Sequence, residues 1–358
     1  MSGVRVGFDV SALLSGDTGV ARYVRELGAA IERADVDVVR FAIGRGRNRS
    51  ALPQATRRIP VPLRLVQRTW TLAGSPRAEQ LAPGCDIVHT PDLVPPPTRR
   101  PLVLTVHDLV ALEHPDLHPP RSSVVQRHQL AAAAERATVV IAVSQATADA
   151  LTARGVDPDR IVVAPNGVTA LPRPRPELAP PGRFLLAVGS LTPRKGLDTL
   201  LAAFARADLP GDVRLVLAGP PGFRADSVTD AIVQHDLGDR VDVLGRVSDE
   251  RLAALYAACT AVCAPSIAEG FGLPILEAGA AGAPVIASDI AVFREVAGEA
   301  AWFARSRDVR AWAGALERVV GDKELRDDLR ERGIDVARQY TWDRSAALTR
   351  AAYERAVA

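Results

Sequence analysis

Short apolar runs alternate with stretches of helical periodicity along most of this chain, and this alternation constrains its fold more than any other feature. The runs are rich in Val, Ile and Leu, which is typical of parallel strands covered by helices on both faces. Because both halves show the pattern, we predict two doubly wound α/β domains. The predicted strands lie near residues 5–10, 36–43, 86–89, 102–106, 139–143, 161–164, 184–188, 213–218, 241–244, 261–264 and 285–287.

Helices are predicted at 20–33, 121–136 and 145–153, and from about residue 308 to the end of the chain with a break at 340–341. A length of 358 residues fits two domains of roughly 150 to 180 residues each. Six prolines crowd the segment 165–181. Proline at that density continues neither a helix nor a central strand, so we interpret the segment as a semi-rigid linker with a boundary near residue 175.

Composition excludes several classes of protein. No apolar run approaches the roughly 18 residues that a membrane span needs, and the N-terminus lacks the basic and then hydrophobic layout of a secretory signal. We therefore expect a cytoplasmic protein. Its 3 cysteines are too few and too irregularly spaced for a disulfide framework or a zinc site. The pairs Asp35/Asp37 and Asp157/Asp159 are interpreted as turn residues, so no metal site is predicted.

A basic segment occupies residues 40–77, because no acidic residue occurs between Asp37 and Glu79. Two interpretations stay open: peripheral contact with the inner face of an anionic membrane or with a phosphate-bearing acceptor, or a solvated loop in an Arg-rich protein. Nucleic-acid binding is disfavoured because the net charge is only +2 and no reading motif is present. The arginines are Arg40, Arg45, Arg47, Arg49, Arg57, Arg58, Arg64, Arg68 and Arg77.

A glycine-rich turn, E-G-F-G-L-P-I-L-E, begins at Glu269 and ends at Glu277. Gly270 and Gly272 permit a sharp turn and close approach to a ligand, and Pro274 suits the first turn of a helix. Free amides and the helix dipole favour a phosphate there, while the two carboxylates are good acceptors for sugar and ribose hydroxyls. Taken alone, the pattern fits either a ligand site or a helix with an acidic first turn.

Other polar residues follow predicted strands, where the ligands of open parallel sheets bind. Arg194 and Lys195 form a cationic pair, in which Arg offers phosphate oxygens a planar fork and Lys offers a compact point charge. Lys195 is also one of only two lysines in the chain. His107 follows another strand, and the loop that enters a helix at Gly19 could bring amides to an anion. Each residue by itself also fits a structural role.

Together these segments resemble the glycosyltransferase family 4 enzymes of GT-B fold. The resemblance spans most of the chain and is strongest between residues 184 and 298, where five segments follow the family's order. In the first half, three segments are similar to its mannosyltransferase B-like branch. The five are 189–196, 245–247, 265–266, 269–277 and 294–298, and the three are 18–23, 105–115 and 164–168.

The resemblance implies an α/β fold of GT-B type, with two Rossmann-like doubly wound domains that face each other across a cleft. We expect an N-terminal acceptor domain over 1–174 and a C-terminal nucleotide-sugar donor domain over 182–340. The C-terminal helix, 341–358, is expected to return and pack towards the N-terminal domain.

Roles for individual residues also follow from the resemblance. Glu269 is expected to hold the donor sugar hydroxyls and Glu277 the ribose. Arg194 and Lys195 are expected to stabilise the leaving diphosphate, and His107 to contact the donor sugar near the reacting carbon. The other expected donor-binding positions are Gly19, Gly189, Val247, Gly270, Phe271, Gly272 and Leu273.

The implied reaction is a retaining, metal-independent transfer of a hexose, with mannose the best guess, from a nucleotide-diphosphate sugar. The acceptor is a hydroxyl of a lipid-linked molecule or a glycan. We expect no cofactor, and GDP-mannose as the possible co-substrate. Three alternatives stay open: a GT-B epimerase, a phosphorylase, or a sugar-nucleotide-binding protein without turnover. A nicotinamide dehydrogenase is disfavoured because no G-x-G-x-x-G follows the first strand of either half.

Overall fold

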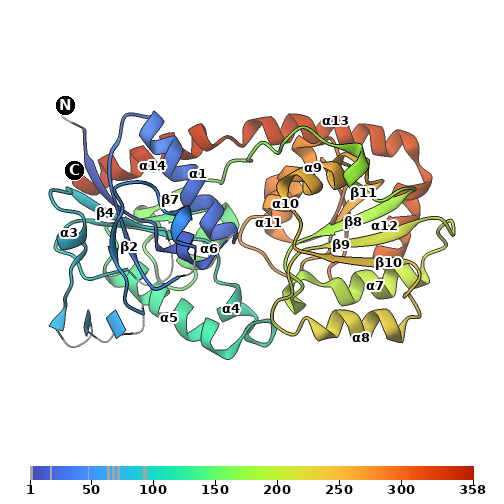
Figure 1. The fold of residues 1–358 in the computed structure, drawn as a ribbon, viewed down its shortest axis with the longest axis horizontal. Coiled ribbons are helices and arrows are strands. Elements are labelled where there is room, and N and C mark those ends of the chain that lie inside the picture. Colours follow the sequence, from blue (N-terminus) through green and yellow to red (C-terminus); the bar gives the residue numbers. More distant parts are fainter. Residues whose placement is uncertain are drawn as a thin grey trace. The chain divides into compact units, whose positions relative to one another are not determined.

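The computed structural model describes residues 3–16, 18–46, 48–62, 65–66, 69–70, 73–91 and 95–358 (Figure 1). The chain divides into two compact units, and each is described by itself below. Unit 1 comprises Met1–Glu113, Arg121–Gly167 and Thr341–Ala358, and unit 2 comprises His114–Pro120 and Val168–Tyr340.

Unit 1 is built on a parallel sheet that has seven strands in the described part of the chain, in the order β3-β2-β1-β4-β5-β6-β7. Its order reverses between β1 and β4, which is the switch point where ligands of such sheets bind. The strands are β1 (Arg5–Asp9), β2 (Asp37–Ile43), β3 (Arg57–Ile59), β4 (Ile87–Thr90), β5 (Leu102–Val106), β6 (Val139–Ala142) and β7 (Ile161–Val163).

Helices cover both faces of this sheet. Residues of α3, α5 and α6 join one apolar cluster with β2, β4, β5 and β6, whereas α14 packs on α1 and on β4 to β7. The C-terminal helix α14 thus contacts the first helix of the chain, as expected. The helices are α1 (Gly19–Arg33), α3 (Ala78–Leu81), α4 (Val110–Glu113), α5 (Pro120–Glu135), α6 (Gln145–Thr152) and α14 (Trp342–Val357).

Unit 2 contains a second parallel sheet, with six strands among the described residues, in the order β10-β9-β8-β11-β12-β13. Its order also reverses next to the first strand, β8, so the unit is doubly wound. The strands are β8 (Phe184–Val188), β9 (Arg214–Ala218), β10 (Val241–Gly245), β11 (Ala261–Ala264), β12 (Val285–Ser288) and β13 (Ala301–Ala304).

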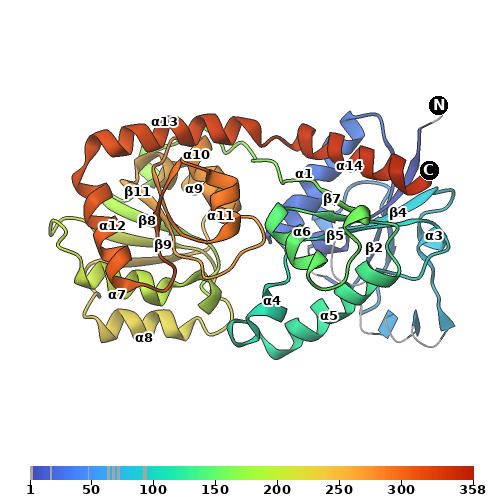
Figure 2. The same cartoon turned by 180° about the vertical axis from the view of Figure 1, so that it is seen from behind.

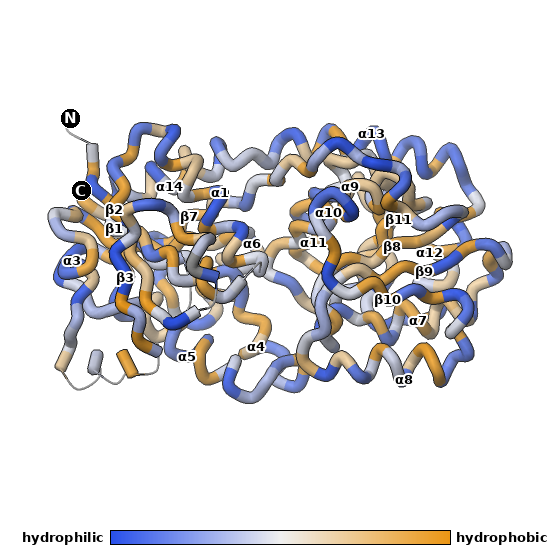
Figure 3. Tube along the Cα trace, in the orientation of Figure 1, coloured by the Kyte–Doolittle hydropathy of each residue, from blue (hydrophilic) through white to orange (hydrophobic). Residues whose placement is uncertain are grey.

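Within unit 2, α7 packs with α12 and α8, and α10 packs with α13 (Figure 2). Its core centres on Trp312 and Phe204, which are fully buried among Leu and Val side chains of the sheet. The strands are apolar in Figure 3, whereas α13 is hydrophilic along much of its length. The helices are α7 (Leu197–Arg206), α8 (Asp226–Gln234), α9 (Asp249–Ala258), α10 (Leu273–Ala280), α11 (Ala291–Ala297), α12 (Val309–Gly321) and α13 (Lys323–Gln339).

The predicted strands agree with the observed ones to within one residue at each end, and the fold class is confirmed. Two edge strands, β3 and β13, were not predicted, and neither is fully buried: β3 begins with Arg57 and Arg58, and Trp302 of β13 is exposed. The predicted domain limits and the cleft between domains stay predictions. Among the described residues, no helix is both long enough and apolar enough to cross a membrane.

Candidate functional site

The loop after β8 places two cations at the carboxyl edge of the unit 2 sheet. Gly189 leaves the strand with φ +137°, and a short 3-10 turn, Pro193–Lys195, carries Arg194 and Lys195. Gly196 then takes the left-handed conformation, φ +62°, and α7 begins at the next residue. A glycine suits this position because left-handed backbone is costly for residues with a Cβ.

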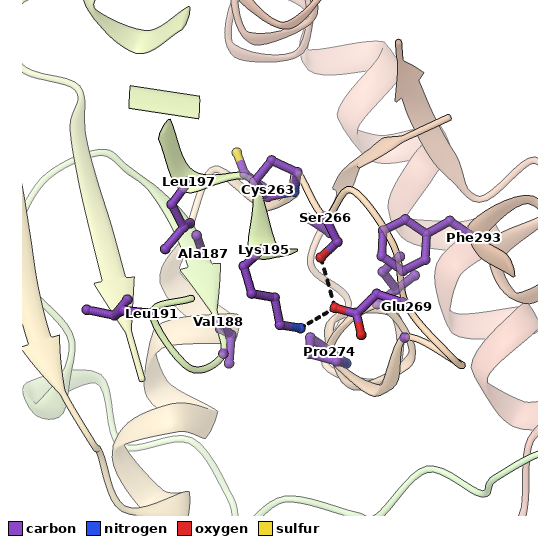
Figure 4. Close-up of a pocket in the computed structure, with 15 residues that line it drawn as sticks. Ala187, Val188, Leu191, Lys195, Leu197, Cys263, Ser266, Glu269, Pro274 and Phe293 are labelled. Carbon is purple, nitrogen blue, oxygen red and sulfur yellow. Dashed lines mark hydrogen bonds and ion pairs between the residues drawn. The ribbon is translucent and has the colours of Figure 1, made fainter. Parts of the chain in front are cut away.

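Both cations contact one carboxylate, that of Glu269. The Nη1 of Arg194 lies 2.5 Å from Glu269 Oε2, and the Nζ of Lys195 lies 2.5 Å from Oε1. Ser266 Oγ donates to the same Oε1 at 2.9 Å. Figure 4 shows Lys195, from the loop after β8, meeting Ser266 and Glu269, which both lie in the loop after β11. We call these four side chains the cation cluster.

The cation cluster is largely withdrawn from water, since the Glu269 side chain is only 9% exposed and the Lys195 side chain 14%. Burial alone raises the pKa of the Glu269 carboxyl, but the charges of Arg194 and Lys195 outweigh it and bring the pKa to about 2. Burial pulls the pKa of the Lys195 ammonium below its usual range, and Glu269 opposes that shift. With Lys195 protonated, the cluster has two positive charges and one negative charge.

Three members of the cation cluster, Lys195, Ser266 and Glu269, line a pocket in unit 2 (Figure 4), whereas Arg194 is not among its lining residues. The start of α10 also lines this pocket, with Gly272 as the N-cap at φ +108°, followed by a proline in the first turn. A Cβ on Gly272 would lie 2.8 Å from the Phe293 ring, so glycine also lets that ring close the wall. The lining residues are Ala187, Val188, Gly189, Leu191, Lys195, Leu197, Cys263, Ala264, Pro265, Ser266, Glu269, Gly272, Pro274, Ile275 and Phe293.

The second carboxylate of the glycine-rich segment, Glu277, lies deeper than Glu269. It is 4% exposed on α10, and its Oε2 accepts a hydrogen bond of 3.1 Å from the Tyr256 hydroxyl. Glu277 is not among the pocket-lining residues of the described chain. Its predicted contact with a ribose therefore stays a prediction.

The other predicted positions of unit 2 take different environments. Gly270 and Phe271 are buried, and the Phe271 ring packs edge-on against Tyr340 at 5.8 Å. Leu273 is partly exposed at the start of α10, and Val247 is partly exposed in the loop after β10. The structure thus gathers Gly189, Lys195, Glu269 and Gly272 around the pocket. The other predicted positions of unit 2 are outside its lining: Arg194, Val247, Gly270, Phe271, Leu273 and Glu277.

Two predicted positions belong to unit 1. His107 follows β5, with its Nε2 2.8 Å from the carbonyl oxygen of Pro91. Burial lowers the pKa of its imidazole, and Pro91 and Asp108 oppose the shift. Gly19 is the first residue of α1, and the N-cap Thr18 accepts a hydrogen bond of 3.1 Å from the amide of Ala21.

Part of the basic segment is used inside unit 1. Arg58 donates to the carbonyl oxygen of Gly44 at 2.8 and 3.1 Å, and Arg40 forms an ion pair with Glu32. Arg57 is exposed on β3. Arg47, Arg64, Arg68 and the side chain of Arg49 lie outside the described part of the structure.

Reasoning from the sequence missed two residues of the site. Ser266 completes the hydrogen bonds of Glu269, and Phe293 closes the pocket wall. Segment 265–266 belongs to the resemblance described above, but no role was predicted for Ser266. No group of three His, Cys, Asp or Glu side chains suited to a metal occurs in the part of the chain that the structure describes.

Comparison with known proteins agrees with this geometry. Residues 173–336 match the family described as glycosyl transferases group 1, and residues 18–170 match glycosyltransferase family 4. The chain is 29% identical over 281 residues to O-antigen chain mannosyltransferase B of Escherichia coli, which covers 75% of this chain and 74% of that protein. It is 35% identical over 286 residues to D-inositol 3-phosphate glycosyltransferase of Actinosynnema mirum, covering 72% of this chain and 67% of the relative.

The fold has a close counterpart among solved structures. The Anabaena protein HepE in complex with UDP and glucose superposes with a TM-score of 0.73 at 21% identity, over 98% of each chain. That likeness extends over both units, and the two family matches together extend from residue 18 to residue 336. The chain therefore belongs to glycosyltransferase family 4 and is a retaining glycosyltransferase of GT-B fold that uses a nucleotide-sugar donor.

Proposed function

We propose that the chain transfers mannose from a nucleoside-diphosphate sugar to a hydroxyl of a lipid-linked or glycan acceptor, with retention at the anomeric carbon. The observation that carries the proposal is the cation cluster beside the unit 2 pocket: Lys195 and Glu269 line the pocket, and Arg194 contacts the same Glu269 carboxylate. Such an arrangement suits a ligand that carries both a diphosphate and hydroxyl groups. The name of the E. coli relative supports mannose.

Arg194 and Lys195 are proposed to stabilise the negative charge that builds on the departing diphosphate. Preorganised charges of this kind act most strongly where water is excluded, as it is around the poorly exposed Lys195. Two side-chain cations can supply the stabilisation that a divalent metal supplies elsewhere. The backbone at the start of α10, around Gly272 and Leu273, is proposed to lie against phosphate oxygens, at the positive end of the helix dipole.

Glu269 is proposed to hold hydroxyls of the donor sugar rather than to attack it. Both its oxygens already accept hydrogen bonds from cations or from Ser266, and a pKa of about 2 makes it a weak nucleophile and a weak base. We therefore propose a displacement on one face of the sugar. The bond from the anomeric carbon to the phosphate oxygen breaks, the bond to the acceptor oxygen forms on the same side, and the acceptor proton goes to the departing diphosphate.

The remaining roles are proposed from the family resemblance alone. They are ribose binding by Glu277, sugar contact by His107, contact of Gly19 with phosphate and acceptor, and base contact by the backbone near Val247. Association of the basic segment with a membrane is likewise a proposal.

A donor panel tests the proposed function. The purified chain is incubated with GDP-mannose, GDP-glucose, UDP-glucose, UDP-galactose and ADP-glucose, and transfer or slow hydrolysis is followed by mass spectrometry. We expect turnover of one donor, with GDP-mannose first, and an α-linked product by NMR if mannose transfer retains configuration. Failure to bind or turn over any nucleotide sugar would remove the proposal. Dependence on inorganic phosphate, or interconversion of sugar epimers, would indicate the alternative GT-B enzymes instead.

A further inference from the structure

Unit 1 contains a chain of buried polar side chains that the proposed reaction does not use. His89 is fully buried on β4, with its Nδ1 2.7 Å from the Tyr353 hydroxyl and its Nε2 2.8 Å from Thr105 Oγ1. Thr105 Oγ1 in turn lies 3.2 Å from the hydroxyl of Tyr23. All four side chains are at most 1% exposed. We call them the tyrosine–histidine chain.

The members of the tyrosine–histidine chain are electrically neutral. Burial lowers the pKa of the His89 imidazole to about 3, with a smaller contribution from His107, and burial raises the pKa of the hydroxyls of Tyr23 and Tyr353. A neutral imidazole has one nitrogen that donates and one that accepts, so His89 can hydrogen-bond to the hydroxyls of Tyr353 and Thr105 at the same time. A buried polar network is rigid when all its hydrogen bonds are made, whereas a buried polar group left without a partner destabilises the fold.

One end of the tyrosine–histidine chain, Tyr23, lies beside His107. Thr105 lies near the end of β5, and His107 is the first residue after that strand. Tyr23 spans both: its hydroxyl meets Thr105, and its ring meets the His107 ring edge-to-face at 4.7 Å and 87°. On another side, Tyr23 packs against the Trp342 ring at 6.0 Å.

The orientation of the His107 ring is fixed from a second direction. The Pro91 carbonyl oxygen can only accept, so Nε2 of His107 is the donor in their 2.8 Å hydrogen bond. Burial favours the neutral ring, which leaves Nδ1 as a hydrogen-bond acceptor. The ring thus offers one acceptor nitrogen in one direction, provided that it does not tilt or rotate.

We infer that Tyr23 is a positioning residue for His107, held by the tyrosine–histidine chain so that the imidazole presents its acceptor Nδ1 to a donor-sugar hydroxyl. The inference rests on the proposed role of His107. Tyr353 and His89 act indirectly: Tyr353 is hydrogen-bonded to His89, His89 to the Thr105 hydroxyl, and that hydroxyl to Tyr23. The C-terminal helix α14 therefore contributes to the geometry of His107 through Tyr353.

The test uses Tyr23→Phe, which keeps the ring and removes its hydrogen bond to Thr105. We expect kcat to fall about 10-fold, the effect of one buried hydrogen bond expressed in the transition state. Ile31→Val is the matched control, because Ile31 is fully buried on the same helix α1. At equal loss of thermal stability, the control should keep kcat within about twofold of the parent chain.

A double-mutant cycle with His107→Ala separates positioning from a general structural effect. If Tyr23 acts through His107, Tyr23→Phe should cost less than about twofold in kcat once the imidazole is gone. If His107→Ala is inactive, the same four proteins are compared by their dissociation constants for GDP-mannose, measured by calorimetry. Equal cost in both backgrounds would overturn the inference.

The inference and the proposed function fail in different ways. If His107→Ala is impaired while Tyr23→Phe equals the Ile31→Val control, only the inference fails. If His107→Ala transfers at a near-normal rate, the proposed role of His107 fails and the inference fails with it. Tyr353→Phe should show a smaller loss of the same sign, and it should be suppressed in the same way by His107→Ala.

Discussion

The backbone amide of Ile267 donates to the carbonyl oxygen of Arg194 at 2.8 Å. This bond joins the loop after β8 to the loop after β11, so the segment with the cations is tied to the segment with Glu269. The two loops approach closely at Gly196, where a Cβ would lie 2.2 Å from the carbonyl oxygen of Pro265. The cation cluster thus depends on a backbone contact as well as on charge.

Gly196→Ala is expected to lower both the free energy of unfolding and the rate of sugar transfer. Left-handed backbone costs roughly 1–2 kcal/mol for a residue with a Cβ, and the contact with Pro265 forces the two loops apart. We expect the free energy of unfolding in urea to fall by at least about 2 kcal/mol. Gly211→Ala is the control, since no atom lies within 4 Å of its Cβ. Equal unfolding curves for the two variants would contradict the strain at residue 196.

Lys195→Ala is expected to lower transfer by about 100-fold or more, the cost of losing one preorganised charge beside a developing anion. The chain supplies its own control in its other lysine, Lys323, which is exposed on α13 and paired with Asp327. Steady-state rates for Lys195→Ala, Lys323→Ala and Glu269→Ala at equal protein concentration make the comparison. The idea fails if Lys195→Ala and Glu269→Ala both keep near-parental rates.

Much of the fold could be predicted from the sequence because parallel strands buried on both faces are continuous apolar runs. The strands β5, β8 and β11, for example, were predicted with their observed limits. By contrast, β3 has the sequence Arg-Arg-Ile, and two charged residues in three conceal a strand at the edge of a sheet. The apolar pattern reports burial, so it fails where a strand is only partly covered.

The sequence pointed to Arg194, Lys195 and Glu269 as parts of one site, but not to their mutual contacts. Those contacts depend on the spacing of the loops after β8 and β11, which are neighbouring strands although about 75 residues separate them in sequence. The tyrosine–histidine chain was also not predicted. Its members come from α1, β4, β5 and α14, and only the folded unit brings them together.

Charge reversal at Arg57 tests the proposed membrane contact. Arg57 is exposed, and each arginine near an anionic surface contributes about 1 kcal/mol, so Arg57→Glu should weaken binding about tenfold or more. Co-sedimentation with phosphatidylglycerol vesicles measures the binding, and neutral phosphatidylcholine vesicles serve as the uncharged reference. Arg350→Glu changes the net charge equally from an exposed position on α14. Unchanged binding of Arg57→Glu would favour a solvated loop.

Asp9→Asn is expected to stabilise the chain above neutral pH. Burial raises the pKa of the Asp9 carboxyl from 3.8 to about 6, against two hydrogen bonds from Ser11. Since the folded-state pKa is the higher one, protonation favours the fold below pH 4, and this stability is lost as the pH rises through 6. At pH 7.5 the variant should gain about 1 to 2 kcal/mol in urea unfolding, with little change at pH 4. A loss at pH 7.5 would show that ionised Asp9 stabilises the fold.

Glu269→Gln should show the opposite pH dependence. The folded-state pKa of Glu269 is about 2, below its ordinary value of 4.5, so the ionised carboxylate stabilises the fold above pH 4.5. That contribution is lost as the pH falls through 2. The difference in unfolding free energy between parent and variant should therefore be largest near pH 6 and shrink steadily between pH 4.5 and pH 2. Arg183 and Asp212 form an exposed ion pair in the same unit, and Asp212→Asn provides the control for a surface pair. A difference that stays constant across this range would mean that the charge of Glu269 does not hold Arg194 and Lys195 in place.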